Sequence, residues 1–186
     1  MIAALYVRED SIYKSFPDVD CWDSKRDARL YTGYYAVVAH PPCRAWGQLS
    51  HMAKPRTDEK ELAIHVIGLI RTVGGVLEHP RGSKLWSHLK LPKPGQFDKF
   101  GGFTICLDQF QFGHKAQKRS LLYIKGCKPN QLPPVPLRFD AVEFTVASKI
   151  KKKSGRRTKA EITKKEREQT PIAFAKWLVA VAELCN

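Results

Sequence analysis

Four consecutive residues, His40-Pro41-Pro42-Cys43, place a cysteine directly after the apolar segment 35–39 (YAVVA). The segment is typical of a buried strand, and the two prolines end it. Open α/β sheets bind ligands at the carboxyl ends of their strands, so we expect Cys43 to face a cleft. A cysteine held there can act as a nucleophile through its thiolate. The alternative is a small buried cysteine beside a tight turn.

Glu78 is the second side chain in such a position. It follows a short apolar segment (GVL) and lies two residues before a proline. We therefore expect it at the same edge of the sheet as Cys43. A carboxylic acid near a nucleophile can protonate a substrate nitrogen. A glutamate in an ion pair or at a helix cap is the alternative interpretation.

A third polar motif, FGHKAQKR at residues 112–119, precedes the apolar segment 121–124. Its basic and amide side chains can bind a base edge or a phosphate, and a solvated loop is the alternative. The three motifs contain one histidine each, His40, His79 and His114, and these can converge. Because the histidines and cysteines lack the spacing of zinc ligands, we expect no metal.

In this order, the three motifs resemble those of the cytosine-5 DNA methyltransferases. HPPC is similar to the Pro-Cys nucleophile loop of that family, LEHPRGSKLW to its Glu-Asn motif, and FGHKAQKRSLLYIKG to its Gln-x-Arg-x-Arg motif. The separations are 35 residues from Cys43 to Glu78 and 41 from Glu78 to Arg119, the size expected in that family. The resemblance covers about residues 36–126.

The resemblance implies covalent catalysis on a cytosine, or a related pyrimidine, flipped out of DNA. Cys43 would attack C6 of the base, Glu78 would protonate N3, and Arg119 would complete the catalytic set. The activated C5 would then take a methyl group from S-adenosylmethionine. Arg44, Gln117 and Lys118 would contact the DNA.

The sequence also departs from the family pattern. His79 stands where the family has Asn, Arg44 where it has Gln, and Leu121 where the second Arg would be. The Phe-x-Gly-x-Gly loop that holds S-adenosylmethionine is not present, since residues 5–10 (LYVRED) contain no glycine, and no cofactor-binding residue is assigned. Two alternatives follow. One is a non-catalytic DNA-binding protein on the same scaffold, and the other is a pyrimidine-modifying Cys43 enzyme with another donor or a free nucleotide substrate.

The elements that must position these residues predict a single α/β domain with a Rossmann-like, mostly parallel sheet and flanking helices. We expect strands near residues 2–7, 35–39, 76–77, 103–107 and 120–124. The spacing of apolar residues predicts a helix over 58–73, with Asp58 and Glu61 in capping-box relation. A C-terminal helix is expected to begin at Thr170-Pro171. The domain comprises residues 1–127 and 170–186.

Residues 128–169 are rich in proline, lysine and arginine and are expected to form an irregular arm that contacts DNA. The whole chain of 186 residues carries 32 Lys and Arg against 18 Asp and Glu, a formal net charge of +14. Such an excess of positive charge favours binding to a polyanion. A basic protein with no role at nucleic acid is the alternative.

Five cysteines without a CxxC pair argue against a disulfide framework, and no apolar segment has the length of a membrane span. We therefore expect a cytoplasmic protein without a membrane partner. The resemblance extends to short phage proteins, for which the compartment would be the host cytoplasm.

The basic arm gives a first testable prediction. Replacement of Lys151, Lys152, Lys153, Arg156 and Arg157 by alanine should weaken DNA binding, because these side chains are expected to contact phosphates. Each lost phosphate contact should also reduce the slope of log affinity against log salt concentration by about 0.9 for duplex DNA. Fluorescence anisotropy over a salt series measures this slope, and an unchanged slope would reject the role.

Overall fold

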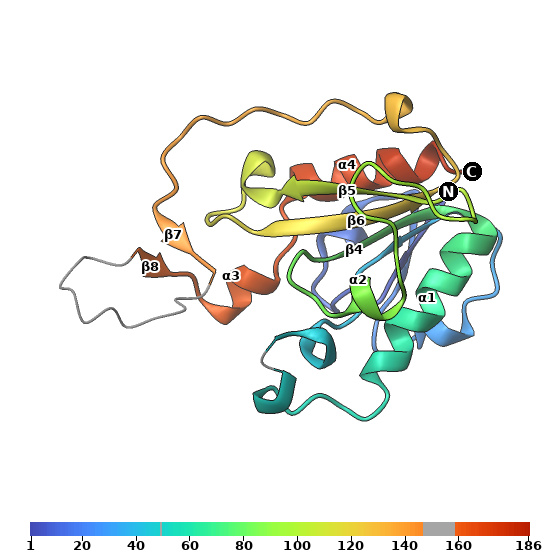
Figure 1. The fold of residues 1–186 in the computed structure, drawn as a ribbon, viewed down its shortest axis with the longest axis horizontal. Helices are drawn as coiled ribbons and strands as arrows, with labels where there is room; N and C mark the ends of the chain where they lie inside the picture. The colour runs from blue at the N-terminus through green and yellow to red at the C-terminus, as the bar shows by residue number, and fades with distance from the viewer. Residues whose placement is uncertain (49, 147–158) are drawn as a thin grey trace.

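A computed structural model describes residues 1–48, 50–146 and 159–186 of the chain. Its centre is a six-stranded sheet in the order β2-β1-β3-β4-β6-β5 (Figure 1). The strands are β1 (Ile2–Leu5), β2 (Val19–Trp22), β3 (Val37–Ala39), β4 (Gly75–Pro80), β5 (Phe103–Asp108) and β6 (Arg119–Lys125). The helices are α1 (Glu59–Val73), α2 (Leu85–His88), α3 (Lys164–Glu168) and α4 (Ile172–Glu183). Short 3-10 segments are η1 (Ile12–Ser15), η2 (Ala28–Leu30), η3 (Arg44–Trp46), η4 (Ser50–Met52), η5 (Gln109–Phe112) and η6 (Pro129–Gln131).

The sheet is mostly parallel, as predicted. β1 pairs in parallel with β2 and β3, β3 pairs in parallel with β4, and only β6 runs against the other five strands. The chain leaves β1 toward β2 on one side and continues with β3 on the other, so the strand order reverses between β1 and β3. Ligands of doubly wound sheets bind outside the carboxyl ends of the strands at such a reversal.

Helices cover both faces of the sheet (Figure 1). Successive side chains of a strand point to opposite faces, and β1 shows this alternation. Ile2 and Ala4 pack in the cluster that contains α4, whereas Ala3 and Leu5 pack in the cluster that contains α1. All four are fully buried. Because the sheet is covered on both faces, a central strand such as β1 has an apolar residue at every position.

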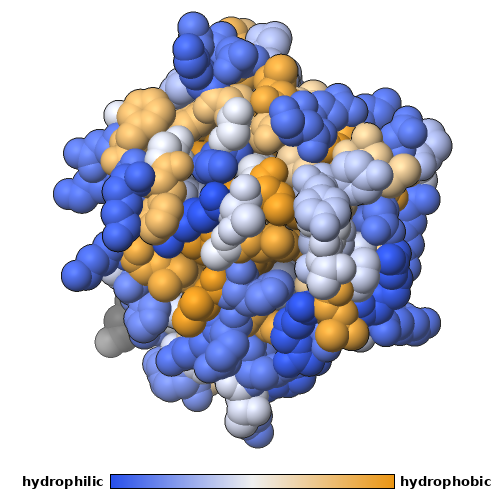
Figure 2. Space-filling view, turned by 90° about the vertical axis from the view of Figure 1, so that its right-hand side faces the viewer, coloured by the Kyte–Doolittle hydropathy of each residue, from blue (hydrophilic) through white to orange (hydrophobic). Residues whose placement is uncertain are grey.

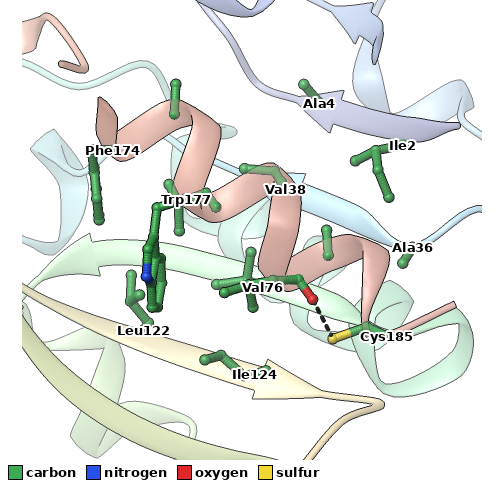
Figure 3. Close-up of a cluster of buried hydrophobic side chains, with 14 of the residues drawn as sticks. Ile2, Ala4, Ala36, Val38, Val76, Leu122, Ile124, Phe174, Trp177 and Cys185 are labelled. Carbon is green, nitrogen blue, oxygen red and sulfur yellow. Dashed lines mark hydrogen bonds between the residues drawn. The ribbon is translucent and has the colours of Figure 1, made fainter. Parts of the chain in front are cut away.

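The C-terminal helix α4 lies across the strands that carry Val38, Val76 and Leu122 (Figure 3). Phe174 and Trp177 are buried beneath it, and the ring of Phe174 packs against that of Phe112 with centroids 5.0 Å apart. The docked terminal helix predicted from its apolar stripe is confirmed. It forms most of one layer of the core.

Three local details differ from the prediction. β2 was not expected, because VDCW is half-buried and shows no apolar alternation. Asp58 makes no side-chain cap on α1, since its carboxylate pairs with Arg29 and Arg56 instead. The helix α4 begins at Ile172, and its N-cap residue is Pro171 rather than Thr170.

The segment 128–169 is only partly irregular. It contains η6, the short strands β7 (Phe144–Thr145) and β8 (Ala160–Glu161), which pair in parallel, and α3. Ion pairs from Lys115 to Glu166 and from Arg8 to Glu168 hold α3 against the domain. Residues 151–153, 156 and 157 of the predicted DNA contacts lie outside the described residues.

Both chain ends lie at the edge of the sheet where β1 and β4 begin (Figure 1). The view onto this side shows apolar atoms at the surface between hydrophilic side chains (Figure 2). The cleft described below opens at the opposite edge. Within the described ranges, no helix combines the length and the hydropathy of a membrane span.

The packing of α4 gives a stability prediction. Phe174→Ala should lower the free energy of unfolding by about 3–5 kcal/mol, because it removes a fully buried ring from the core. Ile172→Ala is the matched control on the same helix, since Ile172 is 52% exposed, and it should cost about 0.5 kcal/mol or less. Urea denaturation measures both, and equal losses for the two variants would contradict this packing.

Candidate active site and nucleic-acid-binding cleft

A cleft of about 1810 Å³ opens at the carboxyl edge of the sheet. Its walls come from the segment after β1, the loops after β3 and β4, the turn before β6, and residues of β7 and α3. The side chains predicted from the sequence that line it are Cys43, Arg44, Glu78, Gln117, Lys118 and Arg119. The structure thus brings the three candidate catalytic residues and three of the candidate DNA contacts into one space.

The sheet explains this convergence. Cys43 ends the turn that follows β3, and Glu78 lies within β4, one strand further along. Arg119 is the first residue of β6, which runs in the opposite direction, so its start meets the carboxyl end of β4. Arg119 also lies opposite Asp108, with 3.9 Å between Nε and the carboxylate. Residues far apart in the sequence are therefore presented at one edge.

Glu78 is the centre of a buried hydrogen-bond network, called the Glu78 network below. Its side-chain oxygens accept hydrogen bonds from Nδ1 of His40 (3.1 Å), Nε2 of Gln109 (3.1 Å) and the hydroxyl of Ser120. The second ring nitrogen of His40, Nε2, contacts the hydroxyl of Tyr13 at 2.9 Å. With Glu78 only 8% exposed, these partners replace the water that the carboxylate gives up.

The network keeps Glu78 ionised. Burial raises the pKa of Glu78, but the hydrogen bond from His40 and the positive charge of Lys118 outweigh it and lower the pKa to about 2. At neutral pH the side chain is a carboxylate. A carboxylate offers roughly four lone-pair directions, and the network uses three of them. Glu78 can therefore accept one more hydrogen bond from the cleft.

Cys43 is a free cysteine at the cleft surface, where the residue as a whole is exposed but its thiol is largely withdrawn from water. Desolvation and the negative charge of Glu78 raise the pKa of Cys43 above its ordinary value of 9.0, while Lys118 acts in the opposite direction. The thiol is therefore protonated at neutral pH. A reaction through its thiolate must remove this proton as the bond to substrate forms.

Two of the three motif histidines flank Glu78. His40 donates to it directly, and His79 is fully buried with burial lowering its pKa to about 4. The Pro42 carbonyl and the Glu78 carboxylate act on His79 in the opposite direction. His114 lines the cleft, but its Nδ1 lies against the backbone of Ala116, 2.7 Å from the carbonyl oxygen. His40 and His114 thus line the same cleft, whereas His79 does not line it and packs its ring against Trp86.

Arg44 is fixed by an acidic partner. Its guanidinium forms an ion pair with Glu59, a fully buried residue in the first turn of α1. The side chain of Arg44 is still 52% exposed and lines the cleft. The ion pair holds the loop that carries Cys43 against α1, and contact of Arg44 with DNA stays a prediction. Sequence reasoning missed Glu59, whose partner lies 15 residues away.

Gln117 and Lys118 lie in the turn that leads into β6. Gln117 is exposed, while Lys118 is half-buried and its backbone N–H donates to Asp108 at 3.0 Å. The ammonium group of Lys118 lowers the pKa of both Glu78 and Cys43. Lys118 is thus the cation that couples the candidate acid and the candidate nucleophile.

The resemblance assigns a site for S-adenosylmethionine to the segment after β1. Tyr6 follows β1 with a φ of 57°, a conformation that favours glycine, and its hydroxyl contacts Nδ1 of His65 at 3.0 Å. The acidic residue after β2, Asp23, pairs with Lys14 at 2.6 Å and accepts backbone hydrogen bonds from Lys25 and Arg26. These residues do not form a glycine cradle, so they do not fit this cofactor in the expected manner. The segment nevertheless lines the same cleft.

Among residues 1–48, 50–146 and 159–186, no group of three His, Cys, Asp or Glu side chains could hold a metal ion. No family model and no curated protein matches the chain. The site is therefore interpreted from its own residues and contacts.

The lowered pKa of Glu78 predicts a specific acid response. Such a group stabilises the fold fully above its ordinary pKa of 4.5, and the contribution is lost as the pH falls from there toward about 2. Wild type should therefore be more stable than Glu78→Gln at pH 7, and the difference should shrink between about pH 5 and pH 3. Urea denaturation of both proteins measures this difference. His40 and Lys118 are present in both proteins, but only wild type has the carboxylate that they face, so a difference independent of pH would contradict the interpretation.

Proposed function

We propose that this protein modifies a pyrimidine, flipped out of DNA, through covalent attack by Cys43. The observation that supports the proposal is the convergence of Cys43, Glu78 and Arg119 on one cleft. Three motifs that resemble those of the cytosine-5 DNA methyltransferases predict the same three residues. A base must leave the duplex before its C6 atom can meet a thiolate.

The protonation states of the site define the proton balance of the first step. In the resting site the Cys43 thiol holds a proton and Glu78 does not. Attack forms a bond between sulfur and C6, the electrons of the C5–C6 double bond move toward C5, and N3 gains a proton. One proton leaves Cys43 and one proton is added to N3, so the step is balanced. Glu78 is ionised and has one lone-pair direction free, so its carboxylate can accept a hydrogen bond from the proton on N3 and stabilise it there; with a pKa of about 2 it does not hold that proton itself.

The surface of the cleft supports DNA as the partner. Its cations outnumber its carboxylates; the basic residues are Arg8, Arg44, Arg81, Lys115, Lys118, Arg119, Lys159, Lys164 and Arg167, and the acidic ones are Asp10, Glu78, Glu166 and Glu168. Among the described residues, Arg81 takes part in no ion pair. Positive groups without acidic partners are available to phosphates.

The electrophile that would react at C5 is left open, because the segment after β1 does not form the glycine cradle of a methyl donor. The same observation favours a second candidate, a DNA-binding protein that keeps the scaffold without catalysis. The two candidates differ in one property. Only the enzyme forms a covalent bond between Cys43 and a base.

A covalent adduct tests the proposal. Wild type incubated with an oligonucleotide that contains 5-azacytosine should gain the mass of the DNA strand, because the ring nitrogen at position 5 takes a proton after attack at C6. The rate should rise with pH toward and beyond 9, since the pKa of Cys43 lies above its ordinary value of 9.0.

Cys43→Ala is the matched control, and it should bind the oligonucleotide without forming an adduct. Glu78→Gln should slow adduct formation by about 10²–10⁴-fold, the usual effect of a general acid or base. Intact-protein mass spectrometry measures all three proteins. Absence of an adduct with wild type, while it binds the oligonucleotide, would favour the non-catalytic candidate.

A further inference from the structure

A second pocket, of about 350 Å³, lies next to the loop that carries Cys43. Its lining residues are Ala45, Trp46, Ser50, Lys60, Lys84, Ser87 and His88. They come from the segment after β3, the first turn of α1, and the turn and short helix after β4. The pocket therefore shares its sheet edge with the cleft but has separate walls.

The lining of this pocket is basic. Lys60, Lys84 and His88 contribute nitrogen donors, and no carboxylate lines the pocket. Within the part of the chain that the structure describes, neither lysine forms an ion pair. Both lysines are exposed, so their ammonium groups are open to a ligand. Two lysines facing one pocket without an acid favour an anion there.

The pocket is held in place by contacts between its walls. The N–H of Lys84 donates to the Trp46 carbonyl at 2.9 Å, and the ring of Trp46 packs on that of His88 with centroids 5.1 Å apart. Lys60 lies 5.9 Å from the centre of the Trp46 ring. Trp46 is only 3% exposed, and its indole N–H has no hydrogen-bond partner among the described residues. These contacts hold the walls of the pocket together before any ligand binds.

We propose that this pocket binds a backbone phosphate of the DNA strand whose base enters the cleft, a role that rests on the proposed function. Trp46 follows Cys43 by three residues through the 3-10 turn η3, which advances roughly 2 Å per residue, or about 6 Å in all. Phosphates along one strand are about 3.4 Å apart along the axis of a duplex. The pocket thus lies close enough to Cys43 for a phosphate near the target nucleotide, on the same strand, to enter it.

The test measures binding alone, in the Cys43→Ala background, so that covalent capture has no part in it. Lys60→Gln with Lys84→Gln should reduce the slope of log affinity against log salt concentration by about 0.9 for duplex DNA. The pocket variant should bind DNA more weakly than the parent, and the ratio of the two affinities should shrink by about 3-fold between roughly 50 and 200 mM salt. Lys99→Gln with Lys176→Gln is the control, since it removes the same charge from exposed positions outside both the pocket and the cleft.

A reduced slope for the pocket variant, with the control equal to the parent, supports the proposal whether or not Cys43 ever forms an adduct. Equal slopes for the pocket variant and the control overturn it, as does a parent that does not bind DNA. Titration with inorganic phosphate, followed through the NMR signals of His88, separates the two sources of phosphate. If the parent binds inorganic phosphate and the pocket variant does not, while both have the same salt slope for DNA, the pocket binds a free phosphate. This outcome would overturn the DNA proposal.

Discussion

The burial of one carboxylate organises this edge of the molecule. Glu78 gives up nearly all of its contact with water, and an ion without partners at that depth would cost several kcal/mol. Its partners come from separate parts of the chain, with His40 after β3, Gln109 in η5 and Ser120 in β6. The hydrogen bonds to Glu78 therefore fix the turn after β3, the segment η5 and the start of β6 relative to one another. The turn after β3 and the start of β6 also carry residues that face the cleft.

The central elements could be predicted because their signals are local. The apolar strands, the amphipathic helix α1 and the terminal helix α4 follow from short-range spacing, and the position of Cys43 follows from a strand and two prolines. The Glu78 network could not be predicted, because each hydrogen bond joins residues 31 to 42 positions apart. One signal was present in the sequence. Ser120 directly precedes the apolar residues 121–124 of β6, and a polar residue that is buried beside them needs a partner.

The charges around Cys43 bear on the proposed attack on a base but not on the methyl donor. Lys118 stabilises the carboxylate of Glu78 and opposes the rise in the pKa of Cys43, so the candidate acid and nucleophile are electrostatically coupled. This coupling concerns attack on a base and does not depend on a methyl donor. The segment after β1, in which the Tyr6 hydroxyl is hydrogen-bonded to His65 of α1, bears only on the binding of a methyl donor. The proposed covalent attack by Cys43 and methyl transfer are thus separate hypotheses that rest on different residues.

Exchange of the C5 hydrogen of cytosine in heavy water tests the central claim most directly, because it requires addition and loss of Cys43 and no other reactant. Thiolate addition at C6 lets C5 take a deuteron, and elimination releases the original proton and the thiol. The account predicts that wild type incorporates deuterium at C5 of cytosine in a DNA oligonucleotide, and that Cys43→Ala does not. Equal incorporation by the two proteins, or none by a wild type that binds the oligonucleotide, would contradict it.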